Sequence, residues 1–267
     1  ALLTAGPFVL ESVTPVDMFP QTQHVESVSI LRFNSARHAQ LEARSMLVLA
    51  STSPRRHEIL RRLGVDFEAA PNDAEEPAAR PGQEPSDVAV ERALIKARAS
   101  AALRESGTII GADTVVELDG KVLGKPKDTN DAWRMLTALR NREHRVITGV
   151  ALIDAATGDE RASYRASRVV MRDYSDDEIN SYISSGDPFD KAGAYAVQHK
   201  EFSPAAEVRG CYLNVVGLPV CTLLKEVARF GLRVRPAPEP PWAELSYCPE
   251  CAKRTGWPVP SKRKRGG

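Results

Sequence analysis

The sequence predicts an α/β protein built on a mixed central sheet with flanking helices. Between residues 46 and 233, apolar segments with strand character alternate with amphipathic helical segments, a pattern typical of strands and helices packed in layers. The dipeptide Asp119-Gly120 lies between two of these strands and is a strong signal for a two-residue hairpin turn. At least one strand pair is therefore expected to be antiparallel, which indicates a mixed sheet.

The first clear strand covers residues 46–50, and a helix is predicted over 54–63. Ser53 is its expected N-cap, Pro54 suits its first turn, and Gly64 can close it. The later predicted strands are 65–71, 107–118, 144–154, 165–174 and a short one ending at Gln198, and the later predicted helices are 86–103, 130–139, 175–186 and 217–231. Helix 86–103 is expected to be capped by Ser86 and to carry Val90, Leu94, Ala97 and Ala101 on one face. Helix 175–186 begins with a capping box of Ser175 and Glu178.

The chain divides into three parts. Residues 1–45 show no sustained periodicity and are expected to form a flexible extension, with Met46 as the natural start; a helix over 36–44 is the alternative. Residues 46–233 form the α/β domain. Residues 234–267 combine a proline-rich linker, a Cys248-x-x-Cys251 knuckle and a basic tail.

Composition excludes several classes of protein. The 267 residues are 42% hydrophobic and 27% charged, with a net charge of +1, so extended nucleic-acid binding is not expected and any anion site must be local. No apolar segment approaches the roughly 20 residues of a membrane span. The N-terminus is a poor signal peptide and the four cysteines form no secreted disulfide framework, so a cytoplasmic location is expected.

Two arginines occupy an unfavourable position in the helix over 54–63. Arg55 and Arg56 lie in its first turn, where the unpaired N–H groups already carry partial positive charge. Cations there cost a few tenths of a kcal/mol to about 1 kcal/mol. The arrangement indicates that this turn binds an anion, and a polyphosphate is the expected one.

The hairpin around Asp119-Gly120 brings charged residues together. Pairing outward from the turn places Asp113 and Thr114 near Lys125. A surface ion pair would explain this equally well. The neighbouring Gly111 and Gly124, however, would allow the backbone to approach a ligand closely, which favours a binding site.

Other polar residues fit a nucleotide. Glu76 lies in an acidic loop and, with Asp113, offers hard oxygen ligands for Mg²⁺; Lys191 supplies a further ammonium, and the Gln198 amide could read a base edge. Each has an ordinary structural reading, as a solvated loop or a turn. The sequence contains no GxxxxGK[ST] and no GxGxxG. Together, these cationic, acidic and amide side chains predict phosphoryl chemistry on a nucleotide.

These motifs, in this order, resemble the Maf family of nucleoside triphosphate pyrophosphatases over residues 46–233. The motifs that carry the resemblance are "LASTSPRR" (49–56), "DAEEP" (73–77), "ALIKA" (93–97), "GADTVV" (111–116), "LGKP" (123–126), "HRVITGV" (144–150), "DKAGAYAVQ" (190–198) and "NVVGLPV" (214–220). The resemblance implies two lobes around a deep cleft, a fold related to the inosine triphosphatases, and cleavage between the α and β phosphates with a divalent metal, Mg²⁺ or Mn²⁺.

The resemblance also implies roles for individual residues. Asp113 is expected to be the general base, and Glu76 to hold the metal together with it. The residues expected around the phosphates are Ser51, Arg55, Arg56, Lys96, Lys125 and Lys191. Arg55, Thr114 and Gln198 match the positions that separate the subgroups, and they are similar to the dTTP/UTP subgroup. His199 departs from the family pattern, which usually has glycine there.

Alternatives remain within and outside this class. A 7-methyl-GTP or broad-specificity pyrophosphatase is one, and a non-catalytic regulator of cell division or a nucleic-acid-binding protein is another. The expected partner is the nucleoside triphosphate. A homodimer stays open as an alternative, and no membrane partner is expected.

The Cys248-x-x-Cys251 pair has the spacing of half a zinc site. A structural site needs four ligands, so His199, Cys211 or a second subunit would have to complete it. A redox pair and an unliganded knuckle are the alternatives that the sequence leaves open.

Overall fold

The computed structural model describes residues 8–16, 26–35, 46–70, 73–232, 234 and 248–255. By its internal contacts the chain forms two compact units, Ala1–Met46 and Leu47–Gly267. The alternative helix over 36–44 lies outside the described residues, as do most of the predicted linker and the basic tail.

The first unit contains a β-hairpin that the sequence analysis did not predict. Strand β1 (Phe8–Val16) pairs antiparallel with β2 (Glu26–Phe33). Large apolar side chains of this hairpin are exposed, among them Leu10, Val13, Ile30 and Phe33. Because a two-stranded ribbon buries neither face by itself, its apolar positions give no clear core pattern in the sequence.

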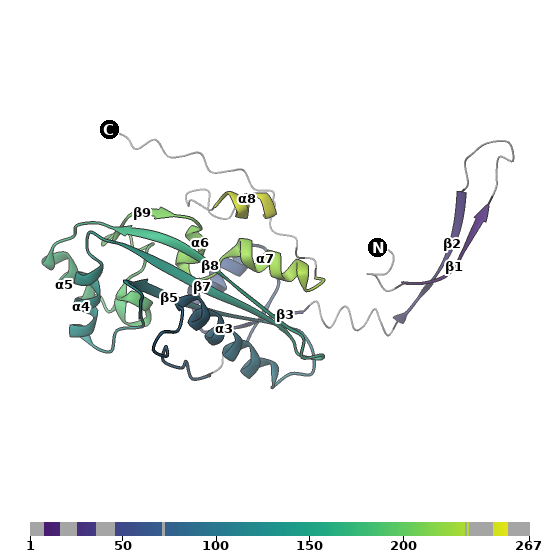
Figure 1. Cartoon of the computed structure of the whole chain (residues 1–267), viewed down its shortest axis with the longest axis horizontal. Helices are drawn as coiled ribbons and strands as arrows, with labels where there is room; N and C mark the ends of the chain where they lie inside the picture. Colours follow the sequence, from purple (N-terminus) through teal and green to yellow (C-terminus); the bar gives the residue numbers. More distant parts are fainter. Residues whose placement is uncertain are drawn as a thin grey trace. The chain divides into compact units, whose positions relative to one another are not determined.

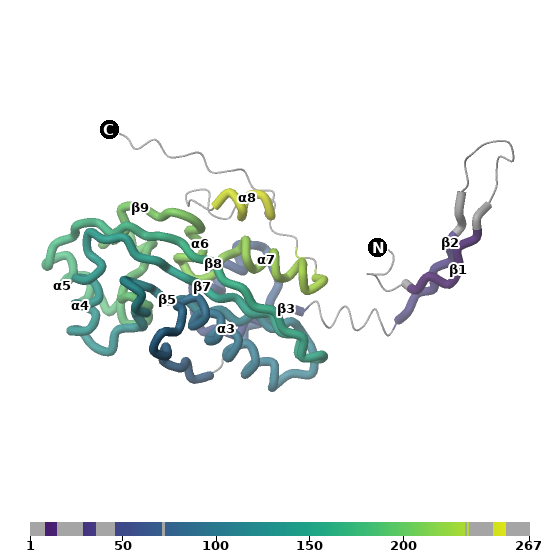
Figure 2. Tube along the Cα trace, viewed as in Figure 1, coloured from purple at the N-terminus to yellow at the C-terminus, as the bar shows by residue number. Residues whose placement is uncertain are grey.

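The second unit contains a seven-stranded mixed sheet, so the predicted fold class is confirmed. Its order is β4-β3-β5-β7-β8-β9, with β6 also paired to β5. The pairs β3–β4 and β3–β5 are parallel and the others are antiparallel. The strands are β3 (Leu47–Ala50), β4 (Glu68–Ala69), β5 (Thr108–Leu118), β6 (Lys121–Leu123), β7 (Glu143–Asp154), β8 (Glu160–Met171) and β9 (Ala205–Arg209). Figure 1 shows the long strands β5, β7 and β8 at the centre of the unit, and Figure 2 traces the same path.

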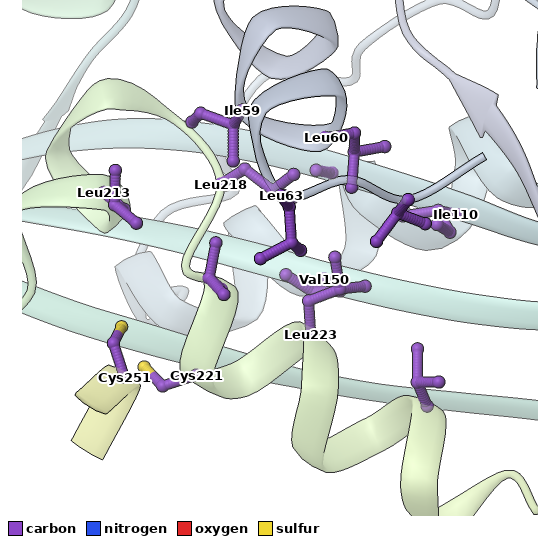
Figure 3. Close-up of a cluster of buried hydrophobic side chains, with 14 of the residues drawn as sticks. Ile59, Leu60, Leu63, Ile110, Val150, Leu213, Leu218, Cys221, Leu223 and Cys251 are labelled. Atoms are coloured by element: carbon purple, nitrogen blue, oxygen red, sulfur yellow. The ribbon is translucent and has the colours of Figure 1, made fainter. Parts of the chain in front are cut away.

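Helices cover both faces of this sheet. Alternate residues of β3, β5 and β7 point to opposite faces, as strand geometry requires. On one face, Val48, Ile109 and Ala151 pack against helix α3. The other face carries two apolar clusters: α2, α6, α7 and α8 pack around Leu49, Ile110 and Val150 (Figure 3), and α4, α5 and η2 pack beyond Val116 and Val146. The two clusters therefore cover different stretches of the same face of the sheet.

The helical elements are α2 (Pro54–Arg62), α3 (Pro85–Ala101), α4 (Thr129–Leu139), α5 (Asp176–Ser184), α6 (Tyr212–Val216), α7 (Val220–Arg229) and α8 (Pro249–Thr255), with the 3-10 turns η1 (Asp187–Asp190) and η2 (Ala192–Ala194). Five of them, α2, α3, α4, α5 and α7, correspond to predicted helices, whereas α6, α8, η1 and η2 were not predicted. The capping box of Ser175 and Glu178 is present at α5. Among the described residues, no helix combines the length and the apolar character that a membrane span requires.

Two predictions of local structure were wrong. The N-cap residue of helix α3 is Glu84 rather than Ser86. Its buried face contains Val88, Ala89, Ala93 and Ala97, so the predicted stripe is confirmed in part: Ala97 is buried, and Leu94 and Ala101 are partly buried against the same cluster. The segment before Gln198 forms the turn η2 followed by irregular chain, not a strand. In it Gly193 has a φ of 70°, which interrupts extended geometry.

Candidate functional site

One edge of strand β5 is unpaired over part of its length. Strand β7 pairs along one edge of β5 from Thr108 to Glu117. On the opposite edge, β3 pairs with residues 108–111 and β6 with residues 116–118, so the ladder on that edge is interrupted over residues 112–115. Asp113 and Thr114 lie in this interruption. A crevice where neighbouring strands diverge is a common place for ligands in α/β proteins.

A cavity of about 730 Å³ lies at this opening. The structure places all ten predicted catalytic and substrate-binding residues on its wall, although they span the chain from position 51 to position 198. They are Ser51, Arg55, Arg56, Glu76, Lys96, Asp113, Thr114, Lys125, Lys191 and Gln198. Its size is within the range of small-molecule sites.

Two carboxylates meet one ammonium group at the centre of the site. Lys96 Nζ lies 2.6 Å from Asp113 Oδ1 and 2.7 Å from Glu76 Oε1. The second oxygen, Asp113 Oδ2, is buried without a hydrogen-bond partner among the described residues. Burial by itself would raise the pKa of Glu76, but the hydrogen bond and charge of Lys96, with Lys125 and Arg92, lower it below its usual value. Glu76 is therefore a carboxylate at neutral pH.

Arg92 is a residue of this site that the sequence analysis missed. Its guanidinium lies 3.9 Å from a carboxylate oxygen of both Glu76 and Asp113, and it donates hydrogen bonds to the carbonyl of Pro77. A signal was present: Arg92 precedes Lys96 by four residues, which places both on one face of a helix. It ties the acidic loop to α3.

The prediction that Gly111 lets the backbone approach a ligand was wrong. A Cβ at Gly111 would lie 2.1 Å from the carbonyl oxygen of Ala93, and one at Gly149 would lie 2.3 Å from that of Ala89. These glycines allow α3 to pack directly on β5 and β7. This close packing sets the position of Lys96 over Asp113. Gly124, by contrast, does line the cavity.

The first turn of α2 forms another wall. Ser53 is the N-cap residue and Pro54 follows it, as predicted, but the Ser53 side chain makes no capping hydrogen bond. The backbone N–H groups of this turn therefore retain the partial positive charge that favours an anion. Arg55 lines the cavity here and lies 3.6 Å from Asp190.

Arg56 is held by a buried hydrogen-bond network. Its guanidinium donates to the Gly217 carbonyl at 2.9 Å, to Ser51 Oγ at 3.1 Å and to Thr114 Oγ1 at 3.2 Å. Burial lowers the pKa of Arg56, and nearby Arg55 lowers it further, whereas Asp113 opposes the shift. With these hydrogen bonds in place, Arg56 shapes the cavity wall and contributes positive charge to it.

Lys125 and Lys191 reach the cavity from two loops. The predicted hairpin pairing is confirmed: Leu118 lies opposite Lys121, and the pairing ends where Val116 lies opposite Leu123. Lys125 follows the paired residues and lies within electrostatic range of Glu76. The Lys191 ammonium lies 3.0 Å from Asp187 Oδ1 and also contacts Asp190. Lys191 is thus already paired by its own loop.

An apolar section of the wall lies next to Thr114 and Gln198. It includes Val116, Leu123, Val146, Tyr195 and Val215. Thr114 Oγ1 lies 2.9 Å from Thr148 Oγ1, which in turn donates to the Asn214 carbonyl at 2.9 Å. The cavity wall therefore combines charged residues with apolar ones and also includes the side-chain amide of Gln198.

The cysteines of the predicted knuckle lie outside this cavity. Cys248 and Cys251 are buried against Cys211 and Cys221. His199, named as one of the candidates to complete the site, is not part of this group; its Nδ1 accepts a hydrogen bond from the Phe202 N–H at 3.0 Å. Cys221 is the member that the sequence analysis did not consider.

Fold and cavity together define an α/β protein with an anion-accepting site that also holds a pair of carboxylates. The chain belongs to the family of Maf-like proteins, whose model matches residues 46–230. It is similar to a dTTP/UTP pyrophosphatase of Dictyoglomus turgidum, with 43% identity over 188 residues, 70% of this chain and 97% of that protein. It is 49% identical over 175 residues to a dTTP/UTP pyrophosphatase of Thermococcus gammatolerans, covering 66% of this chain and 91% of that protein.

Similarity to solved structures is much weaker. A nucleoside-triphosphatase / dITP/XTP pyrophosphatase from Mycobacterium abscessus aligns with a TM-score of 0.33 and 19% identity, over 48% of this chain and 75% of that chain. This similarity is too low to support an argument about the site.

Proposed function

We propose that this protein is a nucleoside triphosphate pyrophosphatase that hydrolyses dTTP and UTP to the monophosphate and pyrophosphate. The observation that carries the proposal is the convergence of ten residues, separated by up to 147 positions in sequence, on one cavity. The printed activities of the relatives from Dictyoglomus and Thermococcus point to the same reaction.

The charged section of the cavity would bind the triphosphate. Arg55, Lys125 and the first turn of α2 offer positive charge at its wall, and Arg56 adds a buried guanidinium behind them. A nucleoside triphosphate brings three to four negative charges at neutral pH, so it would relieve the cation repulsion that the first turn of α2 otherwise carries. The Lys191 ammonium group, which is held by Asp187 and Asp190 of its own loop, would add a further positive charge at the wall.

A divalent cation, Mg²⁺ or Mn²⁺, is part of the proposal. Glu76 and Asp113 would hold it, because their carboxylates share Lys96 as a neighbour and Asp113 Oδ2 is buried with no hydrogen-bond partner among the described residues. Hard oxygen donors of this kind suit either ion. When bound, such an ion balances charge on the phosphates and polarises them.

In the proposed reaction a water oxygen attacks the α-phosphorus. The water proton passes to the Asp113 carboxylate, the bond from the α-phosphorus to the α–β bridging oxygen breaks, and pyrophosphate leaves with the electron pair. Lys96 holds Asp113 through Oδ1, which fixes the carboxylate in place. The cations at the wall stabilise the charge that develops on the leaving pyrophosphate.

The apolar section of the cavity would receive the base. The Gln198 amide has both a donor and an acceptor, as the edge of a uracil or thymine ring requires. Thr114, which also lines the cavity, accepts a hydrogen bond from Arg56. Since cellular triphosphate pools are the expected source of substrate, we place this activity in the cytoplasm.

Asp113→Asn tests the proposal. We expect the variant to lose about 10²–10⁴-fold in turnover of dTTP and UTP, since it cannot accept the proton, while still binding the triphosphate. Asp177→Asn, an exposed change in the first turn of α5, is the matched control and should keep normal turnover. Turnover of Asp113→Asn near the wild-type rate would remove Asp113 from the base role.

The products and a nucleotide panel test the rest. With Mg²⁺ or Mn²⁺, the wild-type protein should release pyrophosphate and monophosphate from dTTP and UTP in preference to purine triphosphates. A preference for 7-methyl-GTP would contradict the proposed base section. Absence of turnover on every triphosphate would favour the non-catalytic alternative.

A further inference from the structure

Four cysteines from separate parts of the chain meet at one point. Cys211 precedes α6, Cys221 lies in α7, and Cys248 and Cys251 lie at the start of α8. Their four sulfur atoms all lie within 4.8 Å of one another. Figure 3 shows the Cys221 side chain on α7 next to the Cys251 side chain on α8.

The spacing of the sulfurs matches a metal tetrahedron. Zinc–thiolate bonds of about 2.3 Å at tetrahedral angles place neighbouring sulfurs about 3.8 Å apart. In the structure the sulfurs lie 3.5 Å apart in Cys248–Cys251, 3.7 Å in Cys211–Cys251 and 3.8 Å in Cys221–Cys248, and the remaining pairs lie within 4.8 Å. A disulfide would need about 2.0 Å between two sulfurs, and it would leave the other two cysteines unexplained. None of the four forms a disulfide in the structure.

Burial adds a second argument. All four cysteine residues are at most 3% exposed, and they pack among apolar neighbours that include Leu213 and Leu218. Four thiols without a cation would offer one another only weak S–H hydrogen bonds. Thiolates are soft ligands, and a closed set of four is the ligand set of structural zinc sites. Because the sulfurs are so close, one ion fits among them, whereas an iron–sulfur cluster distributes its thiolates over several irons.

We propose that Cys211, Cys221, Cys248 and Cys251 bind one Zn²⁺ ion in a structural site that fixes α8 on the α/β domain. Two ligands come from the region matched by the family model, residues 46–230, and two come from beyond it. The ion therefore joins the C-terminal extension to the domain. With four protein ligands it has no open position, so it takes no part in hydrolysis.

The surroundings of the site support this role. Arg165 on β8 forms an ion pair with Glu250 on α8 at 2.8 Å, and its guanidinium lies within electrostatic range of the Cys221 and Cys248 sulfurs. A cation there offsets the net negative charge of a zinc ion bound by four thiolates. Helix α8 has only seven residues, too few to be stable without support from its surroundings.

The site also touches the framework of the cavity. Ser167 Oγ donates to the Cys211 carbonyl at 2.9 Å and accepts from the Cys211 N–H at 3.0 Å, and it accepts from the Asn214 amide at 3.0 Å. Asn214 in turn contacts Thr148 through both its side chain and its carbonyl. The metal would therefore anchor the start of α6 on the same network that positions Thr114.

Metal analysis of the full-length protein, purified without added zinc or chelator, tests the proposal. We expect about one zinc per chain and no reaction of the four thiols with a thiol reagent until the metal is chelated. After removal of zinc, added Co²⁺ should give the intense visible absorption of tetrahedral cobalt–thiolate coordination. Iron in place of zinc, a Cys248–Cys251 disulfide, or a metal-free chain that binds neither Zn²⁺ nor Co²⁺ would each overturn the proposal.

Variants separate the site from the rest of the fold. The double variant Cys248→Ser/Cys251→Ser should lose the zinc, lower the Tm by several degrees and make the C-terminal extension more sensitive to protease. Ser184→Ala, an exposed change in α5 far in sequence from the site, is the control and should retain the metal. Should the double variant fail to fold, zinc content and cobalt spectra of the wild-type protein still decide the question. Full zinc content in a folded double variant would overturn the assignment of these ligands.

Discussion

Replacing Gly111 with alanine would test how the fold positions its charged groups. A Cβ at this position would lie 2.1 Å from the Ala93 carbonyl oxygen and 2.9 Å from the Ala97 Cβ. A carbon–oxygen contact relaxes only at about 3.3 Å. Because the nearest obstacle is helix backbone and not the end of a flexible side chain, α3 would have to move by roughly 1 Å.

The size of the effect follows from this displacement. Inserting a methyl group into a well-packed interior costs about 1–3 kcal/mol, and a backbone clash places Gly111→Ala near the upper end, about 3 kcal/mol. For a domain of this size that corresponds to a Tm lower by roughly 6–12 °C. Hydrolysis should also fall by about 10²-fold, since α3 carries Lys96 and a 1 Å misplacement in an active site can cost that much.

Calorimetry and kinetics on two glycine variants would check this. Gly124→Ala is the control for stability, because a Cβ there meets nothing within 4 Å and its φ is ordinary. Its Tm should equal the wild-type value or exceed it slightly, as the unfolded chain loses entropy. If Gly111→Ala kept both the Tm and the turnover of the wild-type protein, the argument that glycine packing sets the position of Lys96 would be refuted.

Two further predictions concern buried polar groups. Burial lowers the pKa of His144 from 6.5 to about 4. Between these two pH values the unfolded chain binds a proton at His144 and the folded protein does not. The free energy of unfolding therefore decreases as the pH falls, by about 2 kcal/mol between about pH 7 and pH 5. Denaturant unfolding of His144→Gln at both pH values should lack this share of the pH dependence, and an unchanged dependence would contradict the assignment. Arg56→Lys should raise the KM for triphosphate and lower the Tm, because an ammonium cannot reproduce the planar set of hydrogen bonds to Gly217, Ser51 and Thr114. Arg61→Lys, at the exposed end of the same helix, should change neither.

Local sequence signals predicted the elements that short-range physics determines. The Asp119-Gly120 turn set the hairpin register, because both residues adopt the positive φ that such a turn needs. The boundaries of α2 followed from Pro54 and Gly64 in the same way. These features depend on a few neighbouring residues, so no knowledge of the rest of the chain was required.

Predictions were less accurate for features that depend on contacts between distant parts of the chain. The predicted face of α3 included Ala97 but otherwise followed larger apolar side chains, such as Val90 and Leu94. It omitted Ala93, which together with Ala97 packs against Gly111. A helix that approaches a sheet this closely needs small residues, which a hydrophobicity pattern undervalues. Cys221 was overlooked for a related reason. In sequence it is an ordinary core residue, and only the fold brings it to the Cys248-x-x-Cys251 pair.

The interruption in the edge of β5 explains why one strand can serve both sections of the cavity. Successive side chains of a strand point to opposite faces, so Asp113 reaches Lys96 on α3 while Thr114 reaches Arg56 on α2. In a fully paired strand those two side chains would be separated by the sheet. With the edge unpaired over 112–115, one cavity can extend around the strand and contact both. The carboxylate and the hydroxyl are adjacent in sequence because the site is built around an edge of the sheet and not on one of its faces.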